Sequence, residues 1–125
     1  MKKLQPDENE LIGEWLGKGA EVHGNEACDR IEWLISGVLH QIGVDEKSGG
    51  WDKLYRDPVD SRFWLLYYPK SYMHGGGPPS LKNLRLTESE VKDKFVPLEE
   101  WERRMEKFRQ ERNIRPFPES PEERK

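Results

Sequence analysis

Residues 62–68, with the sequence RFWLLYY, restrict the fold of this chain more than any other segment. Successive side chains of an extended strand point to opposite faces, so one face carries Phe63, Leu65 and Tyr67 and the other carries Trp64, Leu66 and Tyr68. A strand with one face in water alternates apolar and polar residues, and this segment does not. We therefore expect both faces to be covered, one by a helix of this chain and the other by a second helix or another molecule.

Turn signals on either side of this segment predict antiparallel neighbours. Residues 57–61, DPVDS, predict a turn, because proline fixes φ at its first central position and aspartate bonds to the backbone ahead of it. Residues 51–56 are the expected strand before this turn, and residues 81–86 alternate weakly as a later one. Near the N-terminus, residues 11–16 and 20–23 flank the sequence GKG and predict a hairpin.

Three helices are expected. Asn25 can cap the first, in which apolar residues recur at helical spacing as far as Ile42, with Gly43 as its stop. Thr87 and Glu90 fit a capping box that starts a short helix. Residues 98–112 predict a longer helix with charged faces and one narrow apolar stripe, made of Leu98, Trp101, Met105 and Phe108.

These segments predict an α+β fold. Its antiparallel sheet has about five strands, with the helix of residues 25–42 over one face and the C-terminal helix over the other, in its own chain or a neighbouring one. We expect residues 1–96 to form the α+β domain and residues 97–115 a helical extension. Residues 116–125 hold three prolines and are expected to be a disordered tail.

Composition excludes several functional classes. No apolar run approaches the roughly 20 residues of a membrane span, and the N-terminus lacks the apolar region of a secretory signal, so we expect a cytoplasmic protein. The single cysteine, Cys28, excludes an internal disulfide framework and a multi-cysteine zinc site. A net charge of −3 does not favour direct binding to nucleic acid.

Charge and aromatic residues point instead to a protein partner. Residues 1–50 carry five basic and ten acidic side chains, which would steer a cationic partner to this part of the chain or would simply form a solvated surface. Tryptophan and tyrosine are frequent at binding hot spots, and eight of them lie between residues 15 and 72. Trp33 lies opposite the apolar stripe of its helix, so it either packs under another element or contacts a partner.

The histidines and glycines give weak signals for chemistry. Residues 74–79, HGGGPP, fit a phosphate loop poorly, because the two prolines lack N–H groups. His23, His40 and His74 do not have the spacing of a helical metal motif, so we expect no metal and no cofactor.

An alternative function nevertheless remains open. A small enzyme or ligand-binding protein could use His74 as a titrating group together with Asp57, Asp60 and Arg62. Hydrogen bonds within the turn and a local ion pair are the commoner explanation of the last three residues, and we favour it.

Several motifs together resemble the immunity protein 27 family of bacterial polymorphic toxin systems. They are GWDKLYRDPVDSRFW at residues 50–64, YP at 68–69 and MHGGGPP at 73–79, preceded by LIGEW at 11–15 and CDRIEWL at 28–34. The resemblance covers roughly residues 10–95. The chain departs from the family pattern at Ser61, where glycine is common, and at Leu65 and Tyr72, where acidic residues are common.

The resemblance implies an intracellular α+β antidote that binds the C-terminal domain of a cognate toxin, a nuclease being one candidate. It would neutralise the toxin by stoichiometric occlusion and would not be an enzyme. From charge, aromatic placement and loop position we expect the contacts to come from Glu10, Glu14, Glu21, Trp33, Asp57, Asp60, Arg62, Tyr72 and His74. Self-association through Leu98, Trp101, Met105 and Phe108 is a further expectation.

Overall fold

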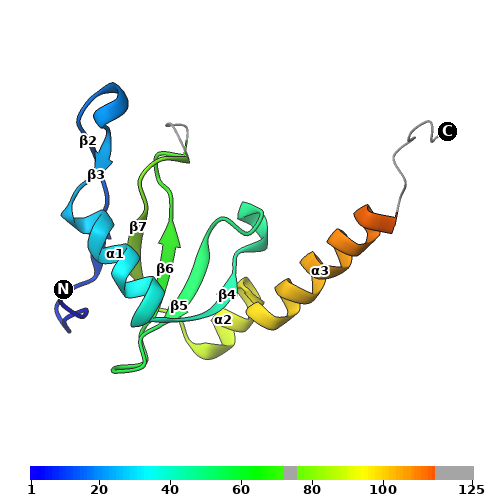
Figure 1. Cartoon of the computed structure of the whole chain (residues 1–125). Coiled ribbons are helices and arrows are strands. Elements are labelled where there is room, and N and C mark those ends of the chain that lie inside the picture. Colours follow the sequence, from blue (N-terminus) through cyan, green and yellow to red (C-terminus); the bar gives the residue numbers. More distant parts are fainter. Residues whose placement is uncertain (72–75, 115–125) are drawn as a thin grey trace.

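The structure, a computed structural model, describes residues 1–71 and 76–114 (Figure 1). Its main element is a six-stranded antiparallel sheet with the order β1-β7-β6-β5-β4-β8. The strands are β1 (Glu10–Ile12), β4 (His40–Val44), β5 (Lys53–Arg56), β6 (Phe63–Tyr67), β7 (Ser80–Leu84) and β8 (Val96–Pro97). The predicted α+β class is confirmed, with six strands in the sheet where about five were expected.

Helix α1 (Glu26–Gly37) covers one face of the sheet (Figure 1). Its buried Ile31 and Leu34 pack on side chains from the sheet, on the segment after α1 and on the N-terminal segment: Tyr55, Trp64, Leu66, Leu81, Leu39 and Leu4. The predicted cap is confirmed, since the Asn25 side chain accepts a hydrogen bond of 3.0 Å from the backbone N–H of Cys28.

The prediction that this helix continues to Ile42 is wrong. It ends at Gly37, and residues 40–44 form β4, which is paired with β5 on one side and with β8 on the other. Glycine is a poor helix former, and two ladders of backbone hydrogen bonds favour the strand over a longer helix. Spacing of apolar residues alone did not distinguish the two structures.

The expected single strand over residues 11–16 is also wrong, because it is divided at Gly13. The Gly13 N–H donates to the Pro79 carbonyl at 3.0 Å, and a Cβ at Gly13 would lie only 2.2 Å from that oxygen. As a result β1 joins the main sheet beside β7, while β2 (Trp15–Leu16) turns back onto β3 (His23–Gly24). The predicted N-terminal hairpin is present in this shorter form, with the 3-10 turn η1 (Gly19–Glu21) in its loop.

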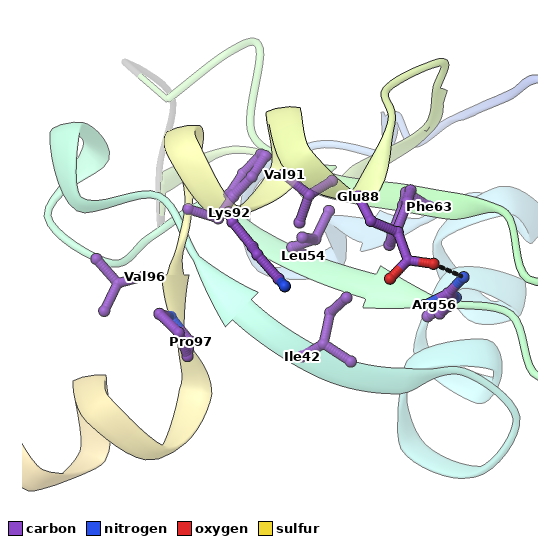
Figure 2. A pocket seen from close by; sticks show the side chains of 10 residues that line it. Ile42, Leu54, Arg56, Phe63, Glu88, Val91, Lys92, Val96 and Pro97 are labelled. Atoms are coloured by element: carbon purple, nitrogen blue, oxygen red, sulfur yellow. Dashed lines mark hydrogen bonds and ion pairs between the residues drawn. The ribbon is translucent and has the colours of Figure 1, made fainter.

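The second face of β6 is covered in part by α2 (Glu88–Lys94). Figure 2 shows Val91 of α2 above Leu54, with Phe63 close by. The three residues line a small hollow with a volume of about 180 Å³. The capping box predicted for this helix is confirmed, with Thr87 and Glu90 bonding reciprocally. The sequence places the longer C-terminal helix over this face, whereas the structure places the shorter one there.

The C-terminal helix α3 (Leu98–Ile114) packs against β4 and β8 and extends away from this edge of the sheet (Figure 1). It follows β8 directly, so the pairing of β8 with β4 fixes where α3 begins. Three residues of its apolar stripe are half-buried, and the fourth, Phe108, is 54% exposed. Among the described residues, no helix is both long and apolar enough to span a bilayer.

Candidate protein-binding surface

The acidic residues expected to contact a partner lie on the N-terminal strands and their hairpin. Glu10 of β1 accepts a hydrogen bond of 2.8 Å from the Tyr67 hydroxyl. Burial, together with this bond to a carboxylate, raises the pKa of Tyr67 to about 12. Glu14 forms an ion pair of 3.0 Å with Lys70, which connects the hairpin to the segment after β6, and Glu21 is exposed at the end of η1.

Asp57, Asp60 and Arg62 form the turn between β5 and β6. Asp57 is only 2% exposed, and its carboxylate accepts from the Val59 N–H at 2.9 Å. The Asp60 carboxylate accepts from the Arg62 N–H at 3.1 Å and from its Nε at 2.7 Å. The interpretation of these residues as a hydrogen-bonded turn with a local ion pair is therefore confirmed.

Arg62 has a second role that the sequence did not indicate. Its guanidinium lies 4.9 Å from the centre of the Trp64 ring and donates to the carbonyls of Gln5 and Glu8 at 2.9 and 2.8 Å. The ring on which it stacks and the two carbonyls that accept from it all belong to this chain. Arg62 thus holds the N-terminal segment against the sheet.

Arg30 of α1 holds the same segment from its other side. It donates to both carboxylate oxygens of Glu8 at 2.7 Å and to the carbonyls of Lys2 and Lys3. The bond from Arg30 lowers the pKa of Glu8 to about 2. Between these anchors Leu4 enters the core and is 7% exposed.

The remaining expected contacts divide into two groups. Trp33 is half-buried and packs against the core cluster that contains Ile31 and Leu34, whereas the sequence analysis placed it opposite their stripe. Tyr72 and His74 lie outside the described residues, so their contacts stay predictions.

The arrangement gives little support to a catalytic site built from Asp57, Asp60, Arg62 and His74. The turn of the first three precedes β6, whereas Ser71 and Gly76, on either side of residues 72–75, lie beyond its other end. In Figure 1 the turn and the C-terminal end of β6, which leads to Ser71, are at opposite ends of the sheet. Within residues 1–71 and 76–114, no group of three or more His, Cys, Asp or Glu side chains is placed to hold a metal ion.

A surface that the sequence analysis did not single out lies at the end of the sheet near Ser71 and Gly76. Its centre is Trp51, which is 60% exposed and meets the Tyr68 ring edge-on, with ring centroids 5.6 Å apart. We call this the Trp51 surface, and the residues that line its hollow are Ser48, Trp51, Asp52, Tyr68, Ser71 and Gly76. Of the aromatic residues in the described part of the chain, only Trp51 and Phe108 are exposed.

Two titratable groups of the Trp51 surface are shifted toward their neutral forms. Burial raises the pKa of the Asp52 carboxyl, and the nearby charge of Asp45 adds to the effect. Burial also raises the pKa of Tyr68, with a smaller contribution from Asp52. The Tyr68 hydroxyl is therefore protonated at neutral pH and can donate a hydrogen bond to a partner.

Glycines give the only sequence signal that could have identified this surface. Gly49 and Gly50, directly before Trp51, both have positive φ, and a Cβ at Gly76 would lie 3.4 Å from the Trp51 ring. Such backbone is easily adopted only by glycine, so the loop that presents Trp51 is specified by its sequence. A tryptophan that follows two glycines in a turn is a candidate for exposure.

Comparison with known proteins identifies the family. Residues 17–85 match the family model described as Immunity protein 27, a span that runs from the loop between β2 and β3 to the residue after β7. It contains α1, the β5–β6 turn and the Trp51 surface, and it stops before α2. No curated protein and no solved structure matches the chain significantly. Since the matched span is more than half of the chain, the protein belongs to the immunity protein 27 family.

Proposed function

We propose that this chain binds the C-terminal domain of a cognate bacterial toxin through the Trp51 surface and blocks it by one-to-one occlusion. Membership of the family implies an immunity protein that neutralises a cognate toxin. The contact surface, the one-to-one ratio and action in the cytoplasm are our additions. The protein consumes nothing in this proposal, and a nuclease toxin is one candidate.

The exposure of Trp51 is the observation that carries the proposal. A tryptophan with 60% of its surface in water is costly for a folded chain, and the edge contact with Tyr68 fixes its ring before any partner arrives. Binding hot spots are enriched in tryptophan and tyrosine because these side chains bury a large area and lose little entropy. A preorganised pair of rings suits tight binding to a toxin.

The neighbouring acidic residues supply the steering that the sequence predicts. In Figure 1 the β2–β3 hairpin, which directly follows Glu14 and contains Glu21, lies at the same end of the sheet as the β4–β5 loop, which contains Trp51. Tyr72 and His74 belong to the segment between Ser71 and Gly76, which line this surface, so we retain both as proposed contacts. Carboxylates around an aromatic anchor favour a basic toxin and raise its association rate.

The other expected contacts are proposed to act as the frame of the molecule. Asp57, Asp60 and Arg62 bond within the β5–β6 turn and to the N-terminal segment, and Trp33 packs on the core. Glu10 accepts a hydrogen bond from the Tyr67 hydroxyl. Because these side chains bond within this chain, we propose that they form a rigid scaffold for the Trp51 surface and that the partner does not contact them.

Protection of growing bacteria tests the proposal. The toxin domain encoded beside the gene of this chain is expressed together with wild-type protein, with Trp51→Ala or with the control Phe108→Ala. Phe108 is the matched control because it is the other exposed aromatic residue, at 54%, and lies on α3. We expect survival with wild type and Phe108→Ala and death with Trp51→Ala. Full protection by Trp51→Ala would contradict the assignment of the Trp51 surface as the toxin contact. Failure of the wild-type protein to protect would contradict the proposed neutralisation of the toxin.

A further inference from the structure

A groove separates α1 from the β2–β3 hairpin and the segment that joins β6 to β7. It has a volume of about 340 Å³, and its lining includes Trp15, Asp29, Glu32, Ile35, Leu66 and Tyr68. Leu66 belongs to the buried core, so the floor of the groove is apolar. The groove is not part of the Trp51 surface, although Tyr68 lines both.

Two carboxylates of α1 stand at this groove without an opposite charge. Asp29 and Glu32 are three residues apart, which places them on the same side of the helix, and both are exposed. Neither side chain takes part in an ion pair with another described residue, whereas Glu8 is paired with Arg30 and Glu14 with Lys70. The groove therefore combines an apolar floor with unneutralised negative charge at its edge.

This combination selects the chemistry of an occupant. A purely apolar side chain would remove water from two unpaired carboxylates, which is unfavourable. A lysine or arginine side chain has an aliphatic stem that packs on apolar residues and a cationic end that pairs with carboxylates. The lining also includes the aromatic rings of Trp15 and Tyr68, and the face of such a ring attracts a cation.

We infer that this groove receives a lysine or arginine side chain of the toxin domain, with the stem on Ile35 and Leu66 and the charge between Asp29 and Glu32. The inference rests on the proposed function, because it supplies a second contact beside the Trp51 surface. It adds a specific ion-pairing site to the general acidic character of the first 50 residues. Of the residues predicted from the sequence to contact the partner, none of those that the structure describes lines this groove.

Charge removal on one helix provides the test. The dissociation constant for the toxin domain encoded beside the gene is measured for wild type and for Asp29→Asn/Glu32→Gln. The control is Glu26→Gln/Glu102→Gln, which removes the same net charge. Both carboxylates are exposed and have no ion-pair partner among the described residues, and Glu26 lies in the first turn of α1 with Asp29. We expect the groove variant to bind about tenfold or more weakly and the control to stay within about twofold of wild type.

A salt series separates an ion pair in the groove from long-range steering. The affinities of wild type and control for the toxin domain should fall similarly with added NaCl. The affinity of the groove variant should fall less steeply, because the toxin's cation no longer has carboxylates to pair with in the groove. Equal affinities and equal salt slopes for the groove variant and the control would contradict the inferred cation site in the groove and would leave the proposed function intact. If the wild type itself does not bind the toxin domain, the proposed function and the groove fall together.

Discussion

The ring of Trp101 lies against Gly50, so closely that a Cβ on Gly50 would be 2.5 Å from the Trp101 ring. This contact joins the first turns of α3 to the loop that presents Trp51. The ion pair of 3.2 Å between Arg104 and Glu46 joins the same two elements one turn later. The C-terminal helix, which lies outside the family match, therefore supports the loop of the proposed surface.

Alanine at Gly50 should destabilise the protein more than alanine at Gly49. Both glycines have positive φ, at 90° and 74°, so each substitution strains the backbone by about 1 kcal/mol or more. Only Gly50 adds a collision with Trp101, since a Cβ at Gly49 meets nothing within 4 Å. We expect chemical denaturation to give an extra loss of about 1–2 kcal/mol for Gly50→Ala. Equal losses would show that Trp101 does not pack here.

Alanine at Gly13 should be among the most damaging single substitutions. A Cβ there would lie 2.2 Å from the Pro79 carbonyl oxygen and 2.7 Å from the Cys28 sulfur. We expect a loss of about 3 kcal/mol or more, because the backbone contact that divides β1 from β2 must open. Gly37→Ala is the control: its Cβ meets nothing, and helix propensity makes the change neutral or stabilising by up to about 1 kcal/mol. A thermal melt of both variants decides, and similar melting temperatures would contradict the account.

The ion pair of Glu8 with Arg30 should make the free energy of unfolding depend on pH in the acidic range. The pKa of Glu8 is about 2 in the folded chain and near its ordinary 4.5 when unfolded. A lowered folded pKa stabilises the native state above about pH 4.5, and this contribution disappears as the pH falls from 4.5 toward 2. Unfolding free energies of wild type and Glu8→Gln should therefore differ at pH 6 and converge toward pH 2. A constant difference across this range would show that the pair contributes no pH dependence.

Glycine at Ser61 should stabilise the chain. Ser61 is the one non-glycine residue with positive φ in the described part of the chain, at 66°, and glycine adopts this backbone without strain. We expect a gain of about 0.5–1 kcal/mol in unfolding free energy for Ser61→Gly. The same chemical change at Ser89, in α2, should cost about 0.5–1 kcal/mol. A loss of stability at Ser61 would mean that its side chain contributes a contact that outweighs the strain.

How well each feature could be predicted depends on the sequence separation between the residues that form it. Local signals were sufficient for Asn25, Thr87 and Glu90, because a cap bonds within three residues. They failed at residues 38–42, where apolar spacing fits a helix and only pairing with β5 and β8 selects the strand. They also gave no prediction for the backbone at Ser61, whose φ of 66° became evident only in the structure.

The candidate site was harder to predict because charge and ring type do not reveal which groups are already engaged. Arg62 and Asp57 were expected at a partner surface, yet one bonds to carbonyls 54 and 57 residues away and the other is buried. Those contacts depend on how the N-terminal segment crosses the sheet, which no local pattern reports. Conversely, the exposure of Trp51 follows from two positive-φ glycines and from the position of α3.

A titration of toxin activity tests the central claim most directly. A fixed concentration of the toxin domain encoded beside the gene, well above its dissociation constant, is mixed with increasing amounts of this protein. We predict a linear fall in toxin activity that reaches its minimum at one equivalent, with recovery of both proteins as an unmodified one-to-one complex. Complete inhibition far below one equivalent would indicate turnover, and undiminished activity at several equivalents would indicate no neutralisation; either result would contradict one-to-one occlusion.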